Sequence, residues 1–202
     1  VFAGDIMQHM PQVDAAWDAS QSKYSYDSCF MFITPFVSNA DIAIANLETT
    51  LAGKPYSGYP AFSSPDELVQ GILKAGFDIA GTANNHCCDR GRKGIERTVS
   101  VLDSLGLMHM GTYHDARSYN QQNPVIITTR GFRLAFLNYT YGTNGIPVPE
   151  NNVVSLIENE RMLRDLKAAS DSVVDKVIVF IHWGDEYQRQ PNAFQKETAS
   201  FL

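Results

Sequence analysis

The sequence has few cysteines and no pattern that would pair them. Among its 202 residues the only cysteines are Cys29, Cys87 and Cys88. An odd number with one adjacent pair is not a disulfide framework, and adjacent cysteines bridge only in a strained geometry, so we expect free thiols. A zinc site of Cys87 or Cys88 with His86 would need a second Cys-x-x-Cys pair, which the sequence lacks.

Long hydrophobic runs, excess positive charge and several familiar motifs are also missing. The longest apolar runs, such as residues 177–181, are far too short to span a bilayer. The formal net charge of −6 gives no general affinity for nucleic acid or for an anionic membrane. Neither a P-loop nor Gly-x-Gly-x-x-Gly is present, and no Gly-x-Ser-x-Gly elbow marks a serine hydrolase.

The length and composition indicate one globular domain. Hydrophobic residues make up 44% of the sequence, and a chain of this size buries about 70% of its unfolded surface. No repeat or low-complexity linker divides residues 1–202, so we predict a single domain. The first residues resemble the inside of a strand and the last residues an uncapped helix, and we therefore expect the chain to be trimmed at both ends.

Short apolar runs alternate with helical patterns, which predicts a layered α/β domain. The predicted strands are residues 1–4, 41–45, 77–81, 107–111, 125–129, 134–137 and 176–181. The predicted helices are residues 65–75, 93–105 and 158–169, with a fourth from Pro191. Ser64 is placed to cap the first helix, whose end is marked by Gly76. The Gly-, Pro- and Tyr-containing stretches 54–64 and 139–152 are predicted surface loops.

The segment 83–91, Ala-Asn-Asn-His-Cys-Cys-Asp-Arg-Gly, carries the strongest functional signal. It follows the predicted strand 77–81 and precedes a predicted helix. Ligands of open α/β sheets bind beyond the carboxyl ends of the strands. Two amides, an imidazole and a carboxylate on one such turn therefore predict a site.

Other predicted strands end in similar side chains. Asp5 ends the first strand, Asn46 and Glu48 follow the second, and His182 follows the last. If these strands are parallel neighbours, the side chains converge on one edge together with the turn 83–91. Carboxylate, amide and imidazole groups suit Mn, Zn or Fe rather than soft metals. Such a cation polarises an ester or phosphoryl oxygen and acidifies water, which is hydrolase chemistry.

Each of these residues also has a structural explanation. An Asp or Asn after a strand commonly forms a turn or caps a helix. A histidine after a buried strand is commonly hydrogen-bonded within the core. Taken singly the structural explanation is favoured, and only the recurrence at four strand ends favours a common site. His109 and His114 lack this context, and we expect a structural role for the first and simple exposure for the second.

The sequence resembles the CapA family of capsule or poly-γ-glutamate biosynthesis proteins, whose domain is similar to the calcineurin-like metallophosphatases. The matching segments extend over nearly the whole chain: Gly4-Asp5-Ile6-Met7, Asn46-Leu47-Glu48-Thr49-Thr50, Ala83-Asn84-Asn85-His86 with Asp89 and Gly91, Gly94-Ile95 with Thr98, Gly111, and His182-Trp183-Gly184 with Glu186-Tyr187. The resemblance implies a four-layer α/β/β/α sandwich, with two sheets packed face to face and helices outside.

The resemblance also implies roles for particular residues. A divalent metal would be held by Asp5, Glu48, Asn85 and His182. His86 would act with Asp5 in catalysis, as the acid toward the leaving oxygen. In the metallophosphatase pattern, however, the first strand carries Asp-x-His. This chain has Met7 at the histidine position and contains no terminal Gly-His-x-His turn. His9 is a candidate substitute, although a surface histidine is the favoured interpretation.

The implied function is capsule or poly-γ-glutamate biosynthesis with a metal-dependent, phosphoesterase-like site. The alternative is a non-catalytic polymer-binding or assembly component, which Met7 and the missing turn favour. The implied partners are an anionic envelope polymer or its precursor and membrane-associated synthesis machinery, with no nucleic acid. The implied location is the cell envelope or outside the cytoplasm. Trp183, Tyr187 and residues 139–141 would line a polymer groove or belong to the core.

Overall fold

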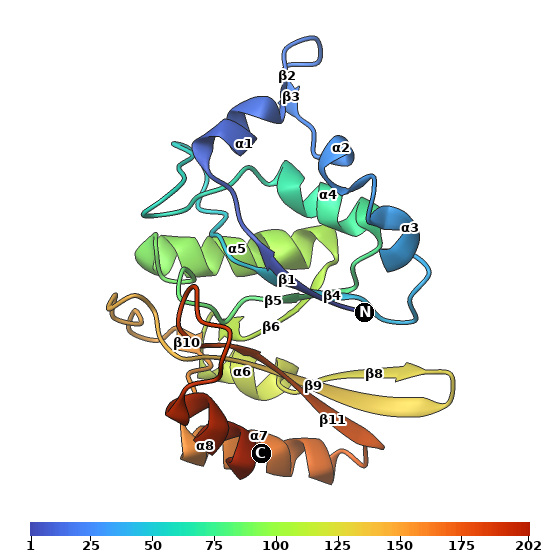
Figure 1. The fold of residues 1–202 in the computed structure, drawn as a ribbon, viewed down its shortest axis with the longest axis vertical. Coiled ribbons are helices and arrows are strands. Elements are labelled where there is room, and N and C mark those ends of the chain that lie inside the picture. Colours follow the sequence, from blue (N-terminus) through green and yellow to red (C-terminus); the bar gives the residue numbers. More distant parts are fainter.

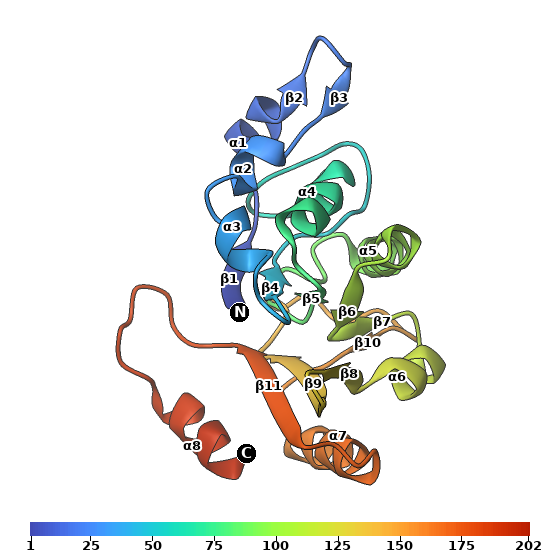
Figure 2. The ribbon, with the colours of Figure 1, turned by 90° about the vertical axis from the view of Figure 1, so that its right-hand side faces the viewer.

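The structure, a computed structural model, describes residues 1–202 and stacks its main elements in four layers (Figures 1 and 2). The first sheet is entirely parallel, in the order β1 (Phe2–Ile6), β4 (Ile44–Leu47), β5 (Ile79–Gly81) and β6 (Met108–Met110). The second sheet has β9 (Phe132–Thr140) at its centre, between parallel β11 (Lys176–His182) and antiparallel β8 (Val125–Thr129). The outer layers are α4 (Glu67–Ala75) and α5 (Gly91–Leu105) on the first sheet and α7 (Asn159–Asp171) on the second. The predicted α/β/β/α arrangement is confirmed.

Alternate side chains of each strand belong to different layers, as the two-residue period of a strand requires. Ile44, Ile79 and Phe136 pack together between the two sheets. Leu47 belongs instead to the cluster that contacts the helices outside the first sheet. On the second sheet, Leu137 packs against α7. The inner strands β4, β5 and β9 are therefore buried on two faces, which explains their nearly continuous apolar runs in the sequence.

The smaller elements lie around this sandwich. A two-stranded ribbon is formed by β7 (Thr112–Tyr113) and β10 (Val153–Val154), and the later helices are α6 (Ala116–Gln122) and α8 (Ala193–Phe201). The segment between β1 and β4 contains α1 (Met10–Ala15), β2 (Trp17–Asp18), β3 (Lys23–Tyr24), α2 (Asp27–Phe30) and α3 (Thr34–Val37). None of the elements in this segment was predicted, because elements of one turn or two residues show no periodicity. All three cysteines are free, as predicted. No helix has the length and hydropathy of a membrane span.

Several predicted boundaries differ from the structure by one to three residues, among them those of β4, β6, β9 and α5. Three further predictions were wrong for a visible reason. The N-cap of α4 is Asp66 rather than Ser64, because the Ser64 hydroxyl is engaged with Thr49 Oγ1 at 2.9 Å. Tyr139 lies in β9 and is 1% exposed, so it is not part of a surface loop. The last helix begins at Ala193, since the side chain of Asn192 accepts a hydrogen bond from the backbone N–H of Gln195.

Gly111, between β6 and β7, occupies a position where no side chain fits. Its φ is +110°, and a Cβ there would collide with Asn138 Oδ1 and with the backbone nitrogen of Ala83. The same Asn138 oxygen accepts a hydrogen bond from that nitrogen at 2.8 Å. This contact anchors the start of the turn 82–90, which links β5 to α5.

We expect Gly111→Ala to lower the free energy of unfolding by about 3 kcal/mol or more, because backbone strain and steric overlap add. Urea denaturation followed by circular dichroism measures the change. The matched control is Gly106→Ala, where φ is +76° but no atom lies within 4 Å of the added Cβ. That change is expected to cost about 1 kcal/mol, and equal losses at the two positions would contradict the steric argument.

Candidate metal centre and its neighbouring histidine

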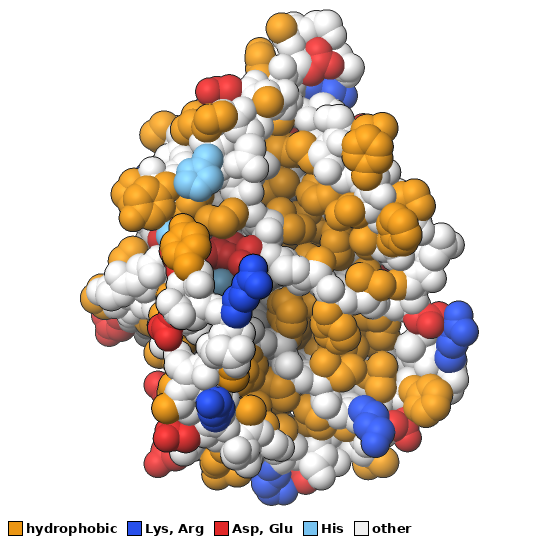
Figure 3. Space-filling model, in the orientation of Figure 1, with side chains coloured by type: hydrophobic (Ala, Val, Ile, Leu, Met, Phe, Trp, Pro, Cys, Tyr) orange, Lys and Arg blue, Asp and Glu red, His pale blue; other side chains and the backbone are white.

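Polar side chains from four strand ends meet at one edge of the sandwich. Asp5 lies near the end of β1, Glu48 directly follows β4, the turn 82–90 follows β5, and His182 is the last residue of β11. The first three strands are parallel neighbours, so their carboxyl ends share an edge. Figure 3 shows acidic side chains and a histidine side by side in a recess of this face.

The predicted ligands lie close together. The ligand atoms of Asp5, Glu48 and His182 all lie within 4.8 Å of one another. His182 Nδ1 is 3.7 Å from Asp5 Oδ1, and His182 Nε2 is 3.9 Å from Glu48 Oε1. The same Nε2 is 3.0 Å from Asn85 Oδ1. The structure thus brings the four residues into one cluster, while their role as metal ligands stays a prediction.

Asn46 lies inside this cluster and was not among the predicted ligands. Its Nδ2 donates to Asp5 Oδ1 at 2.8 Å and lies 3.2 Å from His182 Nδ1. Its Oδ1 accepts from Asn84 Nδ2 at 3.1 Å, and Asn84 also donates to the carbonyl of Leu47 at 2.8 Å. Asn84 therefore orients Asn46, which in turn orients Asp5. The sequence signal for Asn46 was its position two residues before Glu48, at the same strand end.

The two carboxylates differ in their acidity. The hydrogen-bonding imidazole of His182 holds the pKa of Asp5 at about 2 against the opposing effect of burial, and Asn46 adds to the lowering. Burial, and then the negative charge of Asp5, raises the pKa of Glu48 to about 7. The Asp5 side chain is 49% exposed and the Glu48 side chain only 7%. A buried acid beside a second carboxylate is the kind of arrangement that a bound cation relieves.

His86 and Asp89 form a buried pair next to this cluster. His86 Nδ1 lies 2.8 Å from Asp89 Oδ2, and the same oxygen accepts the backbone N–H of Phe62 at 2.7 Å. The Phe62 ring also packs edge-on against His86, with centroids 4.6 Å apart. Burial lowers the pKa of His86, but the hydrogen bond and charge of Asp89 outweigh it, so the pKa is raised. Because Asp89 engages Nδ1, Nε2 is the nitrogen left to exchange a proton with a ligand.

Of the predicted aromatic residues, one lies beside the site and another does not. Tyr141 stacks on His182 with ring centroids 6.1 Å apart, whereas Tyr187 is 97% exposed.

The other candidate residues lie outside the ligand group. The ring of His9 packs against Phe62 rather than joining the ligand group. Met7 is half-buried and lines an apolar groove along β1. His109 is hydrogen-bonded to Asp103 at 3.1 Å, the structural role expected for it.

The donor set suits one divalent cation. Two carboxylates, one imidazole and one amide oxygen are ligands that Mn²⁺, Zn²⁺ and Fe²⁺ accept. The amides of Asn46 and Asn84 already orient this set through their hydrogen bonds. The thioether of Met7 is a poor ligand for a second hard cation. The residues present therefore fit a single metal ion.

Comparisons with known proteins agree with the resemblance. The sequence profile described as "Bacterial capsule synthesis protein PGA_cap" matches residues 1–202. The chain is 28% identical over 216 residues to the capsule biosynthesis protein CapA of Bacillus anthracis, covering 98% of this chain and 49% of that protein. It is 26% identical over 210 residues to the PGA biosynthesis protein CapA of Bacillus subtilis (strain 168), covering 98% and 52%. The chain spans about half the length of these curated relatives.

Two solved structures share the fold. A hypothetical protein from Thermus thermophilus aligns with a TM-score of 0.51 at 14% identity, covering 100% of this chain and 62% of that one. A Staphylococcus aureus protein provisionally assigned as a 5'-nucleotidase, solved in complex with alpha-ketoglutarate, aligns with a TM-score of 0.59 at 13% identity, covering 100% and 41%. At this level of identity the likeness shows the fold alone.

Proposed function

The chain belongs to the bacterial capsule synthesis protein family PGA_cap, and from this we propose that it is a metal-dependent, phosphoesterase-like hydrolase of capsule or poly-γ-glutamate biosynthesis. The observation that supports hydrolysis is the cluster of Asp5, Glu48 and His182, whose ligand atoms lie within 4.8 Å of one another, with Asn85 Oδ1 3.0 Å from His182 Nε2. The buried His86, with one nitrogen engaged, lies on the same turn as Asn85. Metal ligands beside a positioned acid form the minimum set for metal-assisted hydrolysis.

The chain's own residues supply distinct parts of the proposed reaction. Asp5, ionised at all ordinary pH values, and Glu48 would hold the cation with Asn85 and His182. When bound, the cation would polarise a phosphoryl oxygen and activate water. His86 would protonate the leaving oxygen through Nε2, and Asp89 would fix its tautomer and raise its proton affinity.

We also propose that the protein acts in the cell envelope. Its partners would be an anionic envelope polymer or its precursor and membrane-associated synthesis machinery. The support is the family's description and the names of the two Bacillus relatives. A non-catalytic, polymer-binding or assembly role is the second candidate. Met7 favours it, because the histidine of the metallophosphatase Asp-x-His pattern is replaced by a thioether, which is a poor ligand for a hard cation.

Metal analysis and turnover test the proposed activity together. Protein purified after incubation with Mn²⁺, Zn²⁺ or Fe²⁺ is analysed for bound metal, and p-nitrophenyl phosphate hydrolysis is followed with and without each ion. Stoichiometric metal with metal-dependent turnover supports hydrolysis. Protein that retains no metal under these replete conditions refutes it and leaves the non-catalytic role.

The leaving group gives a sharper test of His86. We expect His86→Asn to reduce kcat on an alkyl phosphate at least about 100-fold, the scale of general acid catalysis. The loss on p-nitrophenyl phosphate should be much smaller, because nitrophenolate departs without protonation. Ser104→Ala, a change on the surface of α5, serves as the control variant. Equal losses on both substrates would assign His86 to a structural role instead.

A further inference from the structure

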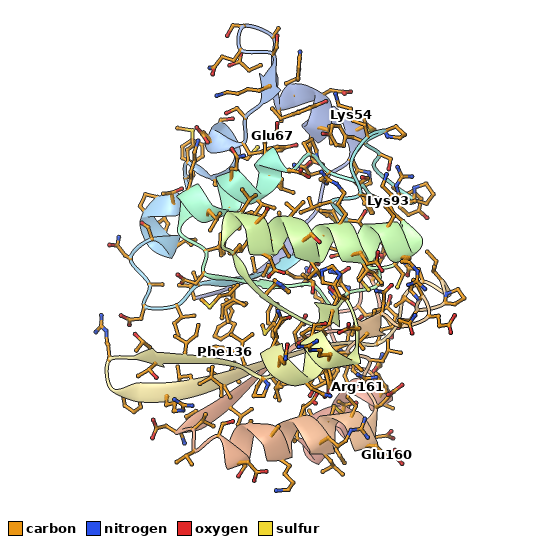
Figure 4. The ribbon with its side chains drawn as sticks, turned by 180° about the vertical axis from the view of Figure 1, so that it is seen from behind. Lys54, Glu67, Lys93, Phe136, Glu160 and Arg161 are labelled. Atoms are coloured by element: carbon orange, nitrogen blue, oxygen red, sulfur yellow. The ribbon has the colours of Figure 1, made fainter.

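A cavity of about 340 Å³ lies beside the His86–Asp89 pair and is lined by three cations. Lys54 comes from the loop after β4, and Arg90 and Lys93 come from the beginning of α5. Figure 4 shows Lys54 and Lys93 at the same end of the molecule, where this loop passes the first turn of α5. Cations from two separate segments thus line one concave surface in a chain whose net charge is −6.

These three cations have no acidic partner, although their neighbours do. On the same helix, Arg92 pairs with Glu96 at 3.6 Å, and Arg97 pairs with Asp66 at 2.7 Å. None of the ion pairs in the structure includes Lys54, Arg90 or Lys93. Arg90 is held in place by donating from Nη2 to the carbonyl of Pro55 at 2.8 Å. Lys54 Nζ lies over the ring of Tyr56, 6.0 Å from its centroid, a contact that leaves its charge in place. The three cations therefore line the cavity without an ion-pair partner.

The N-terminal end of α5 adds to the positive charge at this cavity. The helix begins at Gly91 without a side-chain cap, and its first turn contains no acidic residue. A helix N-terminus carries partial positive charge, and cations placed there are unfavourable unless an anion is bound. Lys93 and Arg90 are placed in this unfavourable position. An anionic ligand would satisfy the helix end and the three cations together.

Asp89 also lines the cavity, but its carboxylate pairs with His86 rather than with the three cations. Its side chain is 1% exposed, and its Oδ2 is occupied by His86 Nδ1 and by the N–H of Phe62. Asp89 therefore connects the two sites: its side chain belongs to the proposed catalytic pair, and the residue is also part of the cavity lining.

We propose that the cavity of Lys54, Arg90 and Lys93 binds an anionic group of the polymer, a carboxylate or a phosphate, next to the bond that is cleaved. The position relative to cleavage rests on the proposed function, whereas anion binding itself does not. A polymer with repeated negative charges can present one such group to the cavity and a neighbouring unit to the metal centre. The cavity would then select polyanionic chains over small phosphoesters.

Binding of a fluorescein-labelled, γ-linked glutamate decamer to the complete 202-residue chain tests the proposal. Fluorescence anisotropy is measured in about 50 mM salt, where charge interactions are weakly screened, and in chelator, so that no metal contributes. We expect Lys54→Gln/Lys93→Gln to raise Kd about tenfold or more, since each exposed charge pair contributes up to about fivefold. Lys176→Gln/Lys196→Gln removes the same charge from exposed positions outside this cavity and should raise Kd less than about twofold.

Competition with inorganic phosphate identifies the anion. Displacement of the decamer by millimolar phosphate from wild type, but not from the double variant, assigns the cavity to phosphate; failure to displace it assigns the cavity to carboxylate. Equal Kd values for the two double variants, or no binding of either probe by wild type, overturn the proposal. Decamer binding that depends on Lys54 and Lys93 without any metal-dependent turnover of p-nitrophenyl phosphate would refute the proposed hydrolase and keep the anion site.

Discussion

Glu48→Gln is expected to weaken the affinity for Mn²⁺ at least about 100-fold, beyond the loss typical of changes in residues that only orient a ligand. Glu48 is almost fully buried at the centre of the cluster, and its carboxylate lies within reach of both Asp5 and His182. The amide of Gln keeps the shape but removes the charge. Isothermal titration with Mn²⁺ measures the affinity, and metal-dependent turnover should fall in parallel.

The same substitution is expected to stabilise the metal-free protein. Burial and Asp5 raise the pKa of Glu48 from 4.5 to about 7, so the folded state binds this proton more tightly than the unfolded state. The stabilisation that the Glu48 carboxyl group provides is then fully present below pH 4.5, and it is lost as the pH rises through about 7. In chelator at about pH 8, Glu48→Gln should raise the free energy of unfolding by about 1 kcal/mol, with little change at about pH 4.5.

Asp5→Asn is the matched control because its effect on stability has the opposite sign. The pKa of Asp5 is lowered to about 2, chiefly by His182, so its ionised form stabilises the folded state above pH 3.8. Asp5→Asn should therefore weaken Mn²⁺ binding as Glu48→Gln does, yet destabilise the metal-free protein at neutral pH. If both variants shift stability in the same direction, the proposed division of charge within the cluster is wrong.

The sequence predicted the layers and the location of the cluster for a simple physical reason. Strands buried on both faces appear as apolar runs, and in a parallel sheet the residues that follow such runs must share an edge. Asp5 lies near the end of β1, and Glu48 and Asn85 follow the neighbouring strands β4 and β5, so their proximity could be inferred from their positions at strand ends. His182 was also predicted from its position at a strand end, on the condition that all four strands are parallel neighbours. That condition is wrong for β11, which pairs with β9 in the other sheet, and His182 reaches the cluster because the two sheets pack face to face.

The sequence could not predict contacts made by irregular segments. Phe62 donates its backbone N–H to Asp89, 27 residues away, from a loop with no periodic pattern. Asp89 was visible in the motif, but its pairing with His86 depends on the turn geometry of residues 82–90. The cation-lined cavity could not be predicted for the same reason, since Lys54 and Lys93 become neighbours only through the path of the loop after β4. Backbone hydrogen bonds and loop paths leave no signature in hydrophobic spacing.

A buried carboxylate far from the site gives the largest expected effect on stability. Asp165 on α7 is 4% exposed. It accepts a hydrogen bond from the hydroxyl of Tyr119 on α6 and another from Tyr139 Oη on β9 at 2.7 Å. Burial raises the pKa of both tyrosines, to about 12 for Tyr119, so both remain donors. These two bonds tie α7 to the second sheet and to α6.

Asp165→Ala is expected to lower the free energy of unfolding by about 3 to 4 kcal/mol, because two charge-assisted bonds are lost and two buried hydroxyls are left unpaired. Urea denaturation of the variant measures this loss. Asp103→Ala is the control: its carboxylate also accepts from a buried side chain, His109, but is 52% exposed, so the cost should stay below about 1 kcal/mol.

A double-mutant cycle separates the free energy contributed by the two hydrogen bonds from the cost of burying the Asp165 carboxylate. Tyr119→Phe and Tyr139→Phe should each cost about 1 to 2 kcal/mol in the native background and almost nothing in Asp165→Leu. Asp165→Leu removes the buried charge but fills its volume, and its stability relative to wild type measures whether the bonds repay the desolvation of the carboxylate. Asp165→Leu could be as stable as wild type while Tyr119→Phe and Tyr139→Phe still lower the free energy of unfolding when Asp165 is present. In that case the two hydrogen bonds contribute specificity of packing rather than net stability. Since β11 is packed between this layer and the first sheet, that specificity would extend to the position of His182.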